Sequence, residues 1–245
     1  MRFTLIWVSI LIMASFSGVS QNTDQNKNGQ EKAGASAASI PQYDVFNPML
    51  DGDSVRLCND RPCHGRIRDY YENGELKHKG FYKDGRLQSS YENYFKNGQL
   101  ERKFQKKGSN NSAELKIYYK NGQKRSDISF YRGAPLEWTE FSKDGKKDFY
   151  ERYDKSLEYI EERIFFHENG NKKSHIELQE EEERKFIQRH FYPDGTLKAR
   201  GPLLHIPEIF AYKRHGEWRF YDENADLDYI QEYYQGEVVE EKEVQ

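Results

Sequence analysis

The chain has 245 residues, of which 36% are hydrophobic, 32% are charged and 15% are aromatic, and its formal net charge is −3. Its 18 Tyr and 15 Phe residues exclude a largely disordered chain, because disordered segments are poor in aromatic residues. The high charged fraction excludes a multi-span membrane protein, and the shortage of aliphatic residues argues against a helix bundle or a Leu/Val-rich α/β enzyme core. Tyr tolerates half-burial with its hydroxyl group in water. Among fold classes, the composition therefore leaves a hydrated β structure rich in Tyr.

The N-terminal residues 1–20 have the order of a secretory signal peptide. Arg2 supplies a positive charge, an apolar run follows, and the small residues Gly18 and Ser20 precede a cleavage site before Gln21. The apolar run of about ten residues is shorter than the about 20 residues that a membrane-spanning helix requires. The pattern predicts an exported protein in the periplasm or cell envelope, or secreted from the cell; an uncleaved membrane anchor is the alternative. Residues 21–39 are polar without an apolar period, which predicts a flexible linker.

Residues 40–64 are predicted to form an N-terminal cap, and they contain the two cysteines, Cys58 and Cys63. Outside the cytosol an isolated close pair favours a disulfide, with free thiols as the alternative. His64 adjoins the pair, but a structural zinc site needs four ligands and the sequence offers no second Cys/His pair. The sequence also lacks a phosphate-binding loop and a dinucleotide fingerprint. It therefore predicts no metal site and no cofactor.

A short turn motif recurs along residues 65–236. Its turn dipeptides are Asn73-Gly74, Asn97-Gly98, Asn121-Gly122, Asp144-Gly145, Asn169-Gly170 and Asp194-Gly195, so that successive glycines are 24, 24, 23, 25 and 25 residues apart. Alternating aromatic and charged residues flank each dipeptide, which predicts a β-hairpin with positive φ at both turn residues. Secondary turns at 83–86 and 132–134 complete a unit of two strands and two turns.

These units predict an all-β fold: one elongated antiparallel meander sheet built from repeated hairpins of about 24 residues, with about 12–14 strands of ordinary length. Consecutive aromatics such as Tyr70 and Tyr71 point to opposite faces, so both faces are expected to carry rings.

The last unit departs from this pattern. Residues 201–214 read as an insertion in which Pro202 and Pro207 break the strand ladder. Ala225 stands where a turn glycine is expected, which predicts a turn that is looser or of another type. Residues 237–245 are predicted to form an acidic tail.

The repeated Tyr-Tyr-x-Asn-Gly-x-Leu-Lys units and the Gly-x-Trp-x-x-Tyr of Gly216, Trp218 and Tyr221 resemble the MORN-repeat variant over roughly residues 65–236. Many bacterial members of this family are YwqK-family antitoxins of toxin–antitoxin systems. The resemblance implies hairpin repeats, binding rather than chemistry, and a bacterial envelope protein.

Candidate catalytic residues are few. Ser54 follows Gly52-Asp53 as in the nucleophile block of some esterases, but none of the seven His residues has an Asp three positions before it. The His residues show no paired metal-ligand spacing, and no carboxylate pair stands out as an acid/base dyad. The sequence therefore predicts that the protein is not an enzyme, with an envelope hydrolase as a distant alternative.

Charge and aromatic residues point to binding. Residues 66–107 hold 11 Lys/Arg against 6 Asp/Glu, a net of +5, whereas residues 222–245 hold 9 acids against one Lys, a net of −8. An ordinary solvated surface accounts for both charged segments. Binding of the basic segment to an anionic membrane surface is a weaker alternative. Binding to nucleic acid is disfavoured because the protein is predicted to be exported. The aromatic rows either pack the sheet or, near Trp138, Trp218 and Tyr221, dock a partner.

We therefore expect an exported protein-interaction or scaffold module of the bacterial cell envelope, with a protein partner and no small-molecule cofactor. An antitoxin or immunity protein that neutralises a toxin is the alternative.

Overall fold

The computed structural model describes residues 55–108 and 112–243, all of which belong to one compact unit, Ile40–Gln245. The predicted signal peptide, the linker and most of the predicted cap, Ser54 included, lie outside the described residues. The strands are β1 (Leu57–Cys58), β2 (Arg61–Pro62), β3 (Gly65–Tyr70), β4 (Leu76–Lys83), β5 (Arg86–Tyr94), β6 (Leu100–Lys107), β7 (Ser112–Tyr118), β8 (Lys124–Tyr131), β9 (Ala134–Phe141), β10 (Lys147–Tyr153), β11 (Ile160–Phe166), β12 (Lys172–Glu180), β13 (Lys185–Phe191), β14 (Leu197–Ile206), β15 (Ala211–Arg214), β16 (Gly216–Tyr221), β17 (Leu227–Tyr234) and β18 (Glu237–Glu243), with one 3-10 turn, η2 (Pro207–Ile209).

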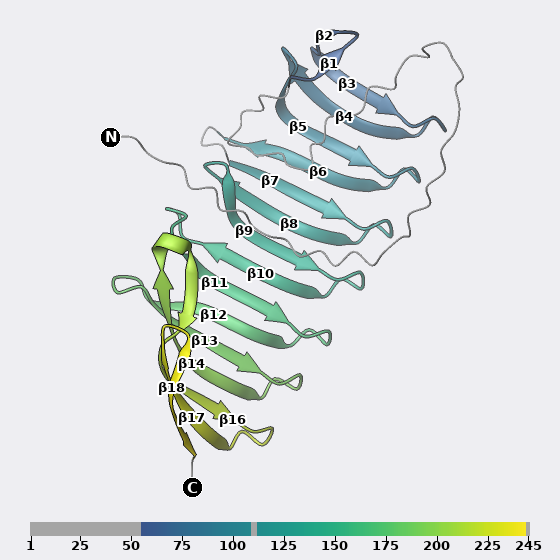
Figure 1. Ribbon diagram of the computed structural model, residues 1–245. Coiled ribbons are helices and arrows are strands. Elements are labelled where there is room, and N and C mark those ends of the chain that lie inside the picture. The colour runs from purple at the N-terminus through teal and green to yellow at the C-terminus, as the bar shows by residue number, and fades with distance from the viewer. Residues whose placement is uncertain (1–54, 109–111, 244–245) are drawn as a thin grey trace, which may run out of the picture. The chain divides into compact units, whose positions relative to one another are not determined.

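The predicted all-β meander is confirmed (Figure 1). Strands β3 to β18 form one open, antiparallel sheet of 16 strands, two more than the upper end of the expected range. Strands follow one another in chain order across the sheet, except that β15 pairs with β14 beside the main path. Short β1 and β2 form a separate two-stranded sheet. Each unit of about 24 residues therefore adds one hairpin to the edge formed by the preceding unit.

The Asn-Gly and Asp-Gly loops lie along one side of the sheet and differ from the predicted two-residue turn. The N–H of Gly74 donates to the carbonyl of Tyr71 (2.9 Å), and the N–H of Tyr71 donates to the carbonyl of Glu75 (2.8 Å). Only the glycine has a positive φ, 85° at Gly74. This is a three-residue loop, a type I turn followed by one left-handed residue, so the prediction of positive φ at Asn73 and its counterparts was wrong. Asn73 instead accepts a hydrogen bond from the N–H of Glu75 through its side-chain oxygen (3.2 Å).

The predicted two-residue geometry occurs along the opposite side of the sheet. Asp84 and Gly85 have φ values of 51° and 76°, and Arg132 and Gly133 have values of 49° and 83°. Two positive φ values in succession define a type I′ turn. The Asn-Gly side of the sheet thus uses one loop type throughout, whereas the opposite side mixes these type I′ turns with longer loops such as that between Asp154 and Tyr159.

The turn at Ala225 keeps the loop geometry of the other units. Ala225 has a φ of 69° and donates to the carbonyl of Asp222 (3.1 Å), as each turn glycine does in its own loop. The expectation of a looser turn was wrong because this loop requires only one left-handed residue. The Asp222 carboxylate compensates by accepting from the N–H groups of Asn224 and Asp226, at 2.9 Å each. A left-handed Ala remains strained by about 1 kcal/mol.

Side chains of one loop donate to backbone carbonyls of the next loop, and we call these contacts the turn ladder. The hydroxyl of Tyr71 donates to the carbonyl of Tyr94 (2.7 Å), one repeat further along the chain. Equivalent bonds join Tyr119 to Phe141 (2.8 Å), His167 to Phe191 (3.0 Å) and Tyr192 to Tyr221 (3.0 Å), and side-chain amides join Asn121 to Lys143 (3.1 Å) and Asn169 to Pro193 (2.5 Å). The ladder connects consecutive hairpins outside the strand pairing itself.

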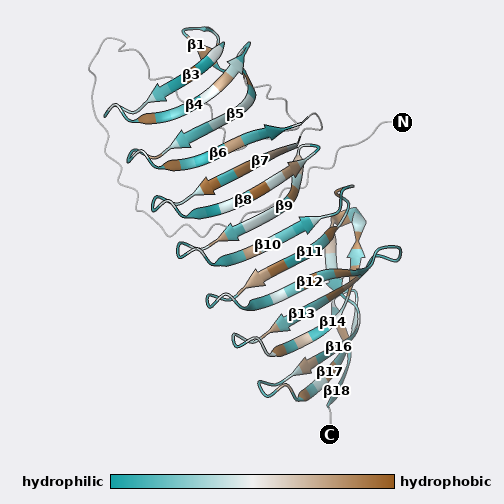
Figure 2. Cartoon of the chain, turned by 180° about the vertical axis from the view of Figure 1, so that it is seen from behind, coloured by the Kyte–Doolittle hydropathy of each residue, from teal (hydrophilic) through white to brown (hydrophobic). Residues whose placement is uncertain are grey.

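The two faces of the sheet differ in chemistry because directly paired residues share a face. On the aromatic face, register-paired positions run through Tyr91, Phe104, Leu115, Ile128 and Trp138. On the charged face, they run through Lys79, Glu92, Lys103, Lys116 and Asp127. Figure 2 shows the resulting alternation of hydrophilic and hydrophobic residues along the strands.

Apolar side chains on the aromatic face gather in two clusters. The first contains Cys63, Tyr82, Leu87, Tyr91, Phe104 and Ala113; the second contains Tyr159, Ile176, Phe186, Ala199, Leu203, Trp218 and Tyr233. Strands β9, β10 and β11 contribute no member to either cluster. Strands β9–β11 therefore separate the two clusters, and they bury Glu151 and Ile160 outside both of them.

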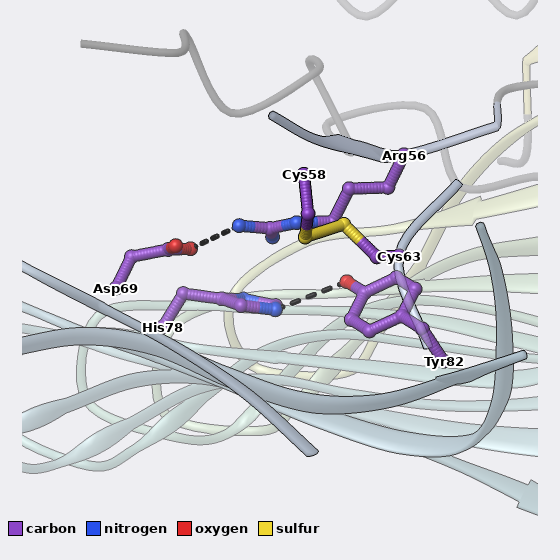
Figure 3. The surroundings of a disulfide bond; sticks show 6 residues. All are labelled: Arg56, Cys58, Cys63, Asp69, His78 and Tyr82. Atoms are coloured by element: carbon purple, nitrogen blue, oxygen red, sulfur yellow. Dashed lines mark hydrogen bonds and ion pairs between the residues drawn. A yellow bond between two sulfur atoms is a disulfide. The ribbon is translucent and has the colours of Figure 1, made fainter. Parts of the chain in front are cut away.

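The predicted disulfide between Cys58 and Cys63 is present and holds the β1–β2 loop over the first cluster. The N–H of Gly85 donates to the carbonyl of Cys63 (2.8 Å), which fixes this cap to the β4–β5 turn. Figure 3 shows the disulfide and the Arg56 guanidinium on one side of His78 and Tyr82. Arg56 forms an ion pair with Asp69 (2.5 Å).

The predicted insertion continues the sheet rather than interrupting it. Pro202 lies within β14 and pairs with Ile187 of β13, so the prediction that it breaks the ladder was wrong. Along the edge that faces away from β13, β14 pairs first with β16, at Ala199, and then with β15, from Leu203 onward. Pro202 lies between these two paired stretches. Proline is tolerated at such an irregularity because no ladder donor is needed there.

The predicted acidic tail also extends the sheet. Residues Glu237–Glu243 form β18, which pairs with β17 after a Gln235-Gly236 turn. Exposed Val238 and Val239 lie in this strand beside its glutamates. The described repeat array therefore ends at residue 243 rather than at residue 236.

Removing the disulfide should destabilise the N-terminal end of the sheet. Replacing both cysteines (Cys58→Ser with Cys63→Ser) should lower the free energy of unfolding by about 2 kcal/mol, because a short covalent loop no longer restricts the unfolded chain. Hydrogen exchange should quicken in β3–β5 and stay unchanged in β16–β18, as expected when contacts extend only between neighbouring repeats. If the double substitution changed the exchange rates of β3–β5 and β16–β18 by the same factor, or changed neither, this account would be contradicted.

Loss of one rung of the turn ladder should weaken the sheet measurably. Tyr71→Phe removes the hydroxyl that donates to the Tyr94 carbonyl, and urea unfolding should show a loss of about 1 kcal/mol. Tyr70→Phe is the matched control, because the neighbouring Tyr70 is 58% exposed and should change stability little. The reverse substitution, Phe95→Tyr, supplies a hydroxyl at the equivalent loop position and should not destabilise. A Tyr70→Phe loss as large as that of Tyr71→Phe would disprove the role of the ladder.

Candidate binding surface

The three aromatic residues that the sequence singles out for binding lie in different environments. Trp218 is fully buried, whereas Trp138 and Tyr221 are half-buried. Tyr221 lies at the end of β16, and its carbonyl accepts the Tyr192 hydroxyl of the turn ladder. A surface anchor must be accessible, so only Trp138 of the two tryptophans remains available to a partner, and Trp218 is corrected to a packing residue.

Trp218 is buried because three neighbours enclose its ring. Gly201 lies directly against it: a Cβ atom added there would come within 2.4 Å of the indole. The Arg214 guanidinium covers the ring as a cation–π contact, 4.2 Å from the ring centroid. The indole Nε1 donates to the Pro202 carbonyl (2.9 Å). The residues that the sequence treats as an insertion therefore supply the packing of this tryptophan.

Trp138 belongs to a row of three aromatic residues on β9, β10 and β11, which we call the aromatic row. The Trp138 and Phe149 rings meet edge to face with centroids 5.9 Å apart, and the Phe149 and Phe165 centroids are 5.1 Å apart. Phe165 is 46% exposed. The row crosses the strands that separate the two apolar clusters, so its rings pack on one another while part of their surface faces solvent.

Hydrogen bonds fix the side chains around the aromatic row. The Nε1 of Trp138 donates to Glu140 (2.5 Å), which also accepts from the Ser126 hydroxyl (2.7 Å). Beside the row, buried Glu151 accepts from Arg163 and from the Tyr153 hydroxyl. Burial, followed by this bond to Glu151, raises the pKa of Tyr153 well above its ordinary value. The row therefore lies in a rigid polar frame.

The opposite, charged face is built from ion pairs between neighbouring strands. Glu92 forms ion pairs with Lys79 (2.6 Å) and Lys103 (3.4 Å), and it accepts a hydrogen bond from Tyr94. Burial opposes ionisation of Glu92, but the bonds from Lys79 and Tyr94 outweigh it and lower the pKa of the carboxyl group. Glu92 is thus paired with lysines of both neighbouring strands.

The shallow hollows on the described part of the sheet include one of about 240 Å³, a second of about 330 Å³ and a third of about 360 Å³. Arg66, Arg68 and Lys79 line the first together with Glu92. Glu114, Asp127 and Glu137 line the third together with Lys116. The second lies against β13–β17 and is lined by basic and aromatic residues. Within residues 55–108 and 112–243 no group of three or more His, Cys, Asp or Glu residues is placed to hold a metal ion.

Sequence reasoning missed Phe149, Phe165 and Arg214. The first two are surface candidates only because strand register places them beside Trp138, and register depends on the β-bulges that follow the turns. Arg214 lies at the end of the insertion, whose return onto the sheet has no signal in the repeat pattern. The described part of the chain contains no helix long and apolar enough to cross a membrane.

The comparisons with known proteins concern the repeat. Residues 64–84 match the MORN repeat variant family. No curated protein sequence matches the chain significantly. Two crystal structures of TarM, one of them a mutant of the S. aureus protein in complex with fondaparinux, alpha-GlcNAc-glycerol and UDP, align with 61% of this chain at 10% and 11% identity and a TM-score of 0.23. The alignment spans only 21% of TarM, so the likeness carries no argument about activity.

The matched residues coincide with one structural unit. They comprise β3, the first Asn-Gly loop and β4, the hairpin that recurs along the sheet. MORN repeats are in general modules that interact with proteins or membranes. The chain therefore carries a MORN repeat of the variant type.

Proposed function

We propose that this chain is an exported, non-catalytic module that binds a protein partner in the bacterial cell envelope. The observation that carries the proposal is the aromatic row, which lies half exposed on the aromatic face between two covered clusters. The general role of MORN repeats as interaction modules supports it. The signal-peptide pattern of residues 1–20 is the basis for the assignment to the envelope.

The aromatic row has the properties of an interface core. Large, flat rings give much contact area for few rotatable bonds, and Trp is enriched among residues that dominate binding energy. The Glu140 bond to Trp138 holds the indole in place before a partner arrives, so less side-chain entropy is lost on binding.

Charged residues surround the row as a polar rim. Arg163 and Glu151 lie on the next register positions of the same face and are bonded to each other, and Glu140 lies on the same face, where it accepts a hydrogen bond from Trp138. An apolar centre with a charged rim is the usual arrangement of a protein–protein interface. A protein partner therefore suits this surface better than a small substrate, for which the row offers no enclosed pocket.

A photo-crosslinking amino acid at position 165 should capture the partner in cells. The same amino acid at position 81 is the matched control: Phe81 is also a strand phenylalanine, is 43% exposed, and lies on the charged face. A discrete adduct should form from position 165 and be absent from position 81. Replacing Trp138 by Ala should weaken capture about tenfold or more, as expected for an anchor worth about 2 kcal/mol. Equal adducts from both positions would argue against the aromatic row as the binding surface.

The predicted export can be tested by measuring the mass of the mature protein. Protein recovered from the cell envelope or medium should have a mass that corresponds to a chain beginning at Gln21, because signal peptidase cuts after the small residue Ser20. Full-length protein retained in the cytosol would refute the envelope assignment and leave the crosslinking result to be interpreted separately.

A further inference from the structure

The hollow of about 330 Å³ against β13–β17 differs from the other two in its charge. Lys173, Lys198 and Arg214 line it, together with His167 and His190, and its lining includes no carboxylate. The other two hollows each contain at least one Glu that balances their cations. We call this site the basic hollow.

The three cations of the basic hollow lack an acidic partner. Among the described residues, neither lysine nor Arg214 has a carboxylate within ion-pair distance, although the adjoining residues 222–245 carry a net charge of −8. Arg214 is held in place by its hydrogen bond to the Tyr233 hydroxyl (2.8 Å) and by the Trp218 ring beneath it. An ordered, half-buried guanidinium without a counter-ion is a ready binding group for an anion.

His190 reports the electrostatic state of the hollow. Its Nε2 atom is buried without a hydrogen-bond partner. Burial first, and then the charges of Arg214 and Lys198, lower the pKa of the imidazole to about 4. His190 is therefore neutral at physiological pH, and Lys173, Lys198 and Arg214 supply positive charge to the hollow.

Aromatic rings form the wall of the basic hollow. Phe220 and Tyr229 stack with centroids 4.4 Å apart and planes 9° from parallel. Tyr192 lies at the edge, beneath the Lys198 ammonium at 5.1 Å. A ligand with an anionic group and a flat or ring-shaped body would contact both the cations and this wall.

We propose that the basic hollow binds a phosphate monoester carried on a ring-bearing body. Three convergent cations suit a group with close to two negative charges, which a phosphate monoester carries near neutral pH and a single carboxylate or sulfate ester does not. The planar Arg214 guanidinium can donate two parallel hydrogen bonds to phosphate oxygens, and the lysines act as point charges. This site is independent of the aromatic row, so it adds a small-molecule ligand to the proposed protein partner.

The test uses phenyl phosphate as the probe and the His190 imidazole signal in NMR as the readout. Phenyl phosphate should shift this signal saturably and raise the imidazole pKa, because the bound dianion offsets the charges of Arg214 and Lys198. Phenyl sulfate has the same ring and a tetrahedral head with a single charge, and it should bind about tenfold more weakly, equivalent to about 1.4 kcal/mol. Inorganic phosphate should also bind more weakly than phenyl phosphate, because it does not contact the wall.

Two lysine variants separate the site from general surface charge. Lys198 and Lys77 follow their turn glycines by three residues and each lies over the ring of a turn tyrosine, at 5.1 and 5.6 Å, but only Lys198 lines the hollow. Lys198→Gln should weaken phenyl phosphate binding about tenfold, and Lys77→Gln should leave it unchanged. Both side chains are surface lysines, so both variants should fold. Equal affinity for phenyl phosphate and phenyl sulfate, an equal loss in both variants, or no saturable shift of His190 would overturn the proposal.

Discussion

Each regular hairpin of the described sheet buries its side chains mainly against the hairpins beside it. Apart from the β1–β2 cap over the first cluster and the insertion over the second, apolar contacts of the described sheet run along rows from strand to strand, as in the stacked rings of Tyr91 and Phe104 (5.4 Å). The turn ladder adds hydrogen bonds in the same direction, from the side chains of one loop to the carbonyls of the next. Stability then depends on nearest-neighbour interfaces, and every unit must remain compatible with the units on either side.

The described sheet begins and ends with an edge strand, β3 at one end and β18 at the other. The residues of β18 are all exposed, and four of the seven are glutamates. Arg66 and Arg68 are the exposed counterparts on β3. Like charges directly opposite each other are unfavourable, so two β18 edges, or two β3 edges, are poor partners for one another. Charge thus protects the edges that the repeat architecture creates.

The repeat could be predicted from the sequence because its signal is local. The spacing from Gly74 to Gly195 establishes the hairpins, and the disulfide follows from two cysteines in one short loop. The loop type could not be predicted in the same way: Asn-Gly suits both a two-residue turn and the second half of a three-residue loop, and the choice depends on how the flanking strands pair. The hydrogen bond from the N–H of Glu75 to the Asn73 side-chain oxygen is a feature of the three-residue loop.

The binding surfaces were harder to predict because they depend on contacts between distant residues. Trp218 has the sequence setting of a repeat tryptophan, yet its burial depends on Gly201 and Arg214, which come from the insertion. The Ile160 N–H donates to the Tyr212 hydroxyl (2.7 Å), 52 residues further along the chain, and this bond places the insertion over the second cluster. No periodicity in the sequence encodes that return.

The candidate sites occur where the units differ from one another rather than where they agree. In a regular unit the polar and charged groups find partners within the array. The glycine closes the loop, and the turn side chain donates to a carbonyl of the next loop. Lysines pair with carboxylates on the neighbouring strand, as Lys79 does with Glu92. The aromatic row occupies the interval that neither cluster covers, and the basic hollow forms where Arg214 returns from the insertion without a carboxylate partner. Because the regular units supply a rigid frame of fixed spacing, a small local departure is enough to hold aromatic or charged groups in a defined geometry. In such an array the repeat specifies the scaffold, and its irregular units specify what the scaffold can bind.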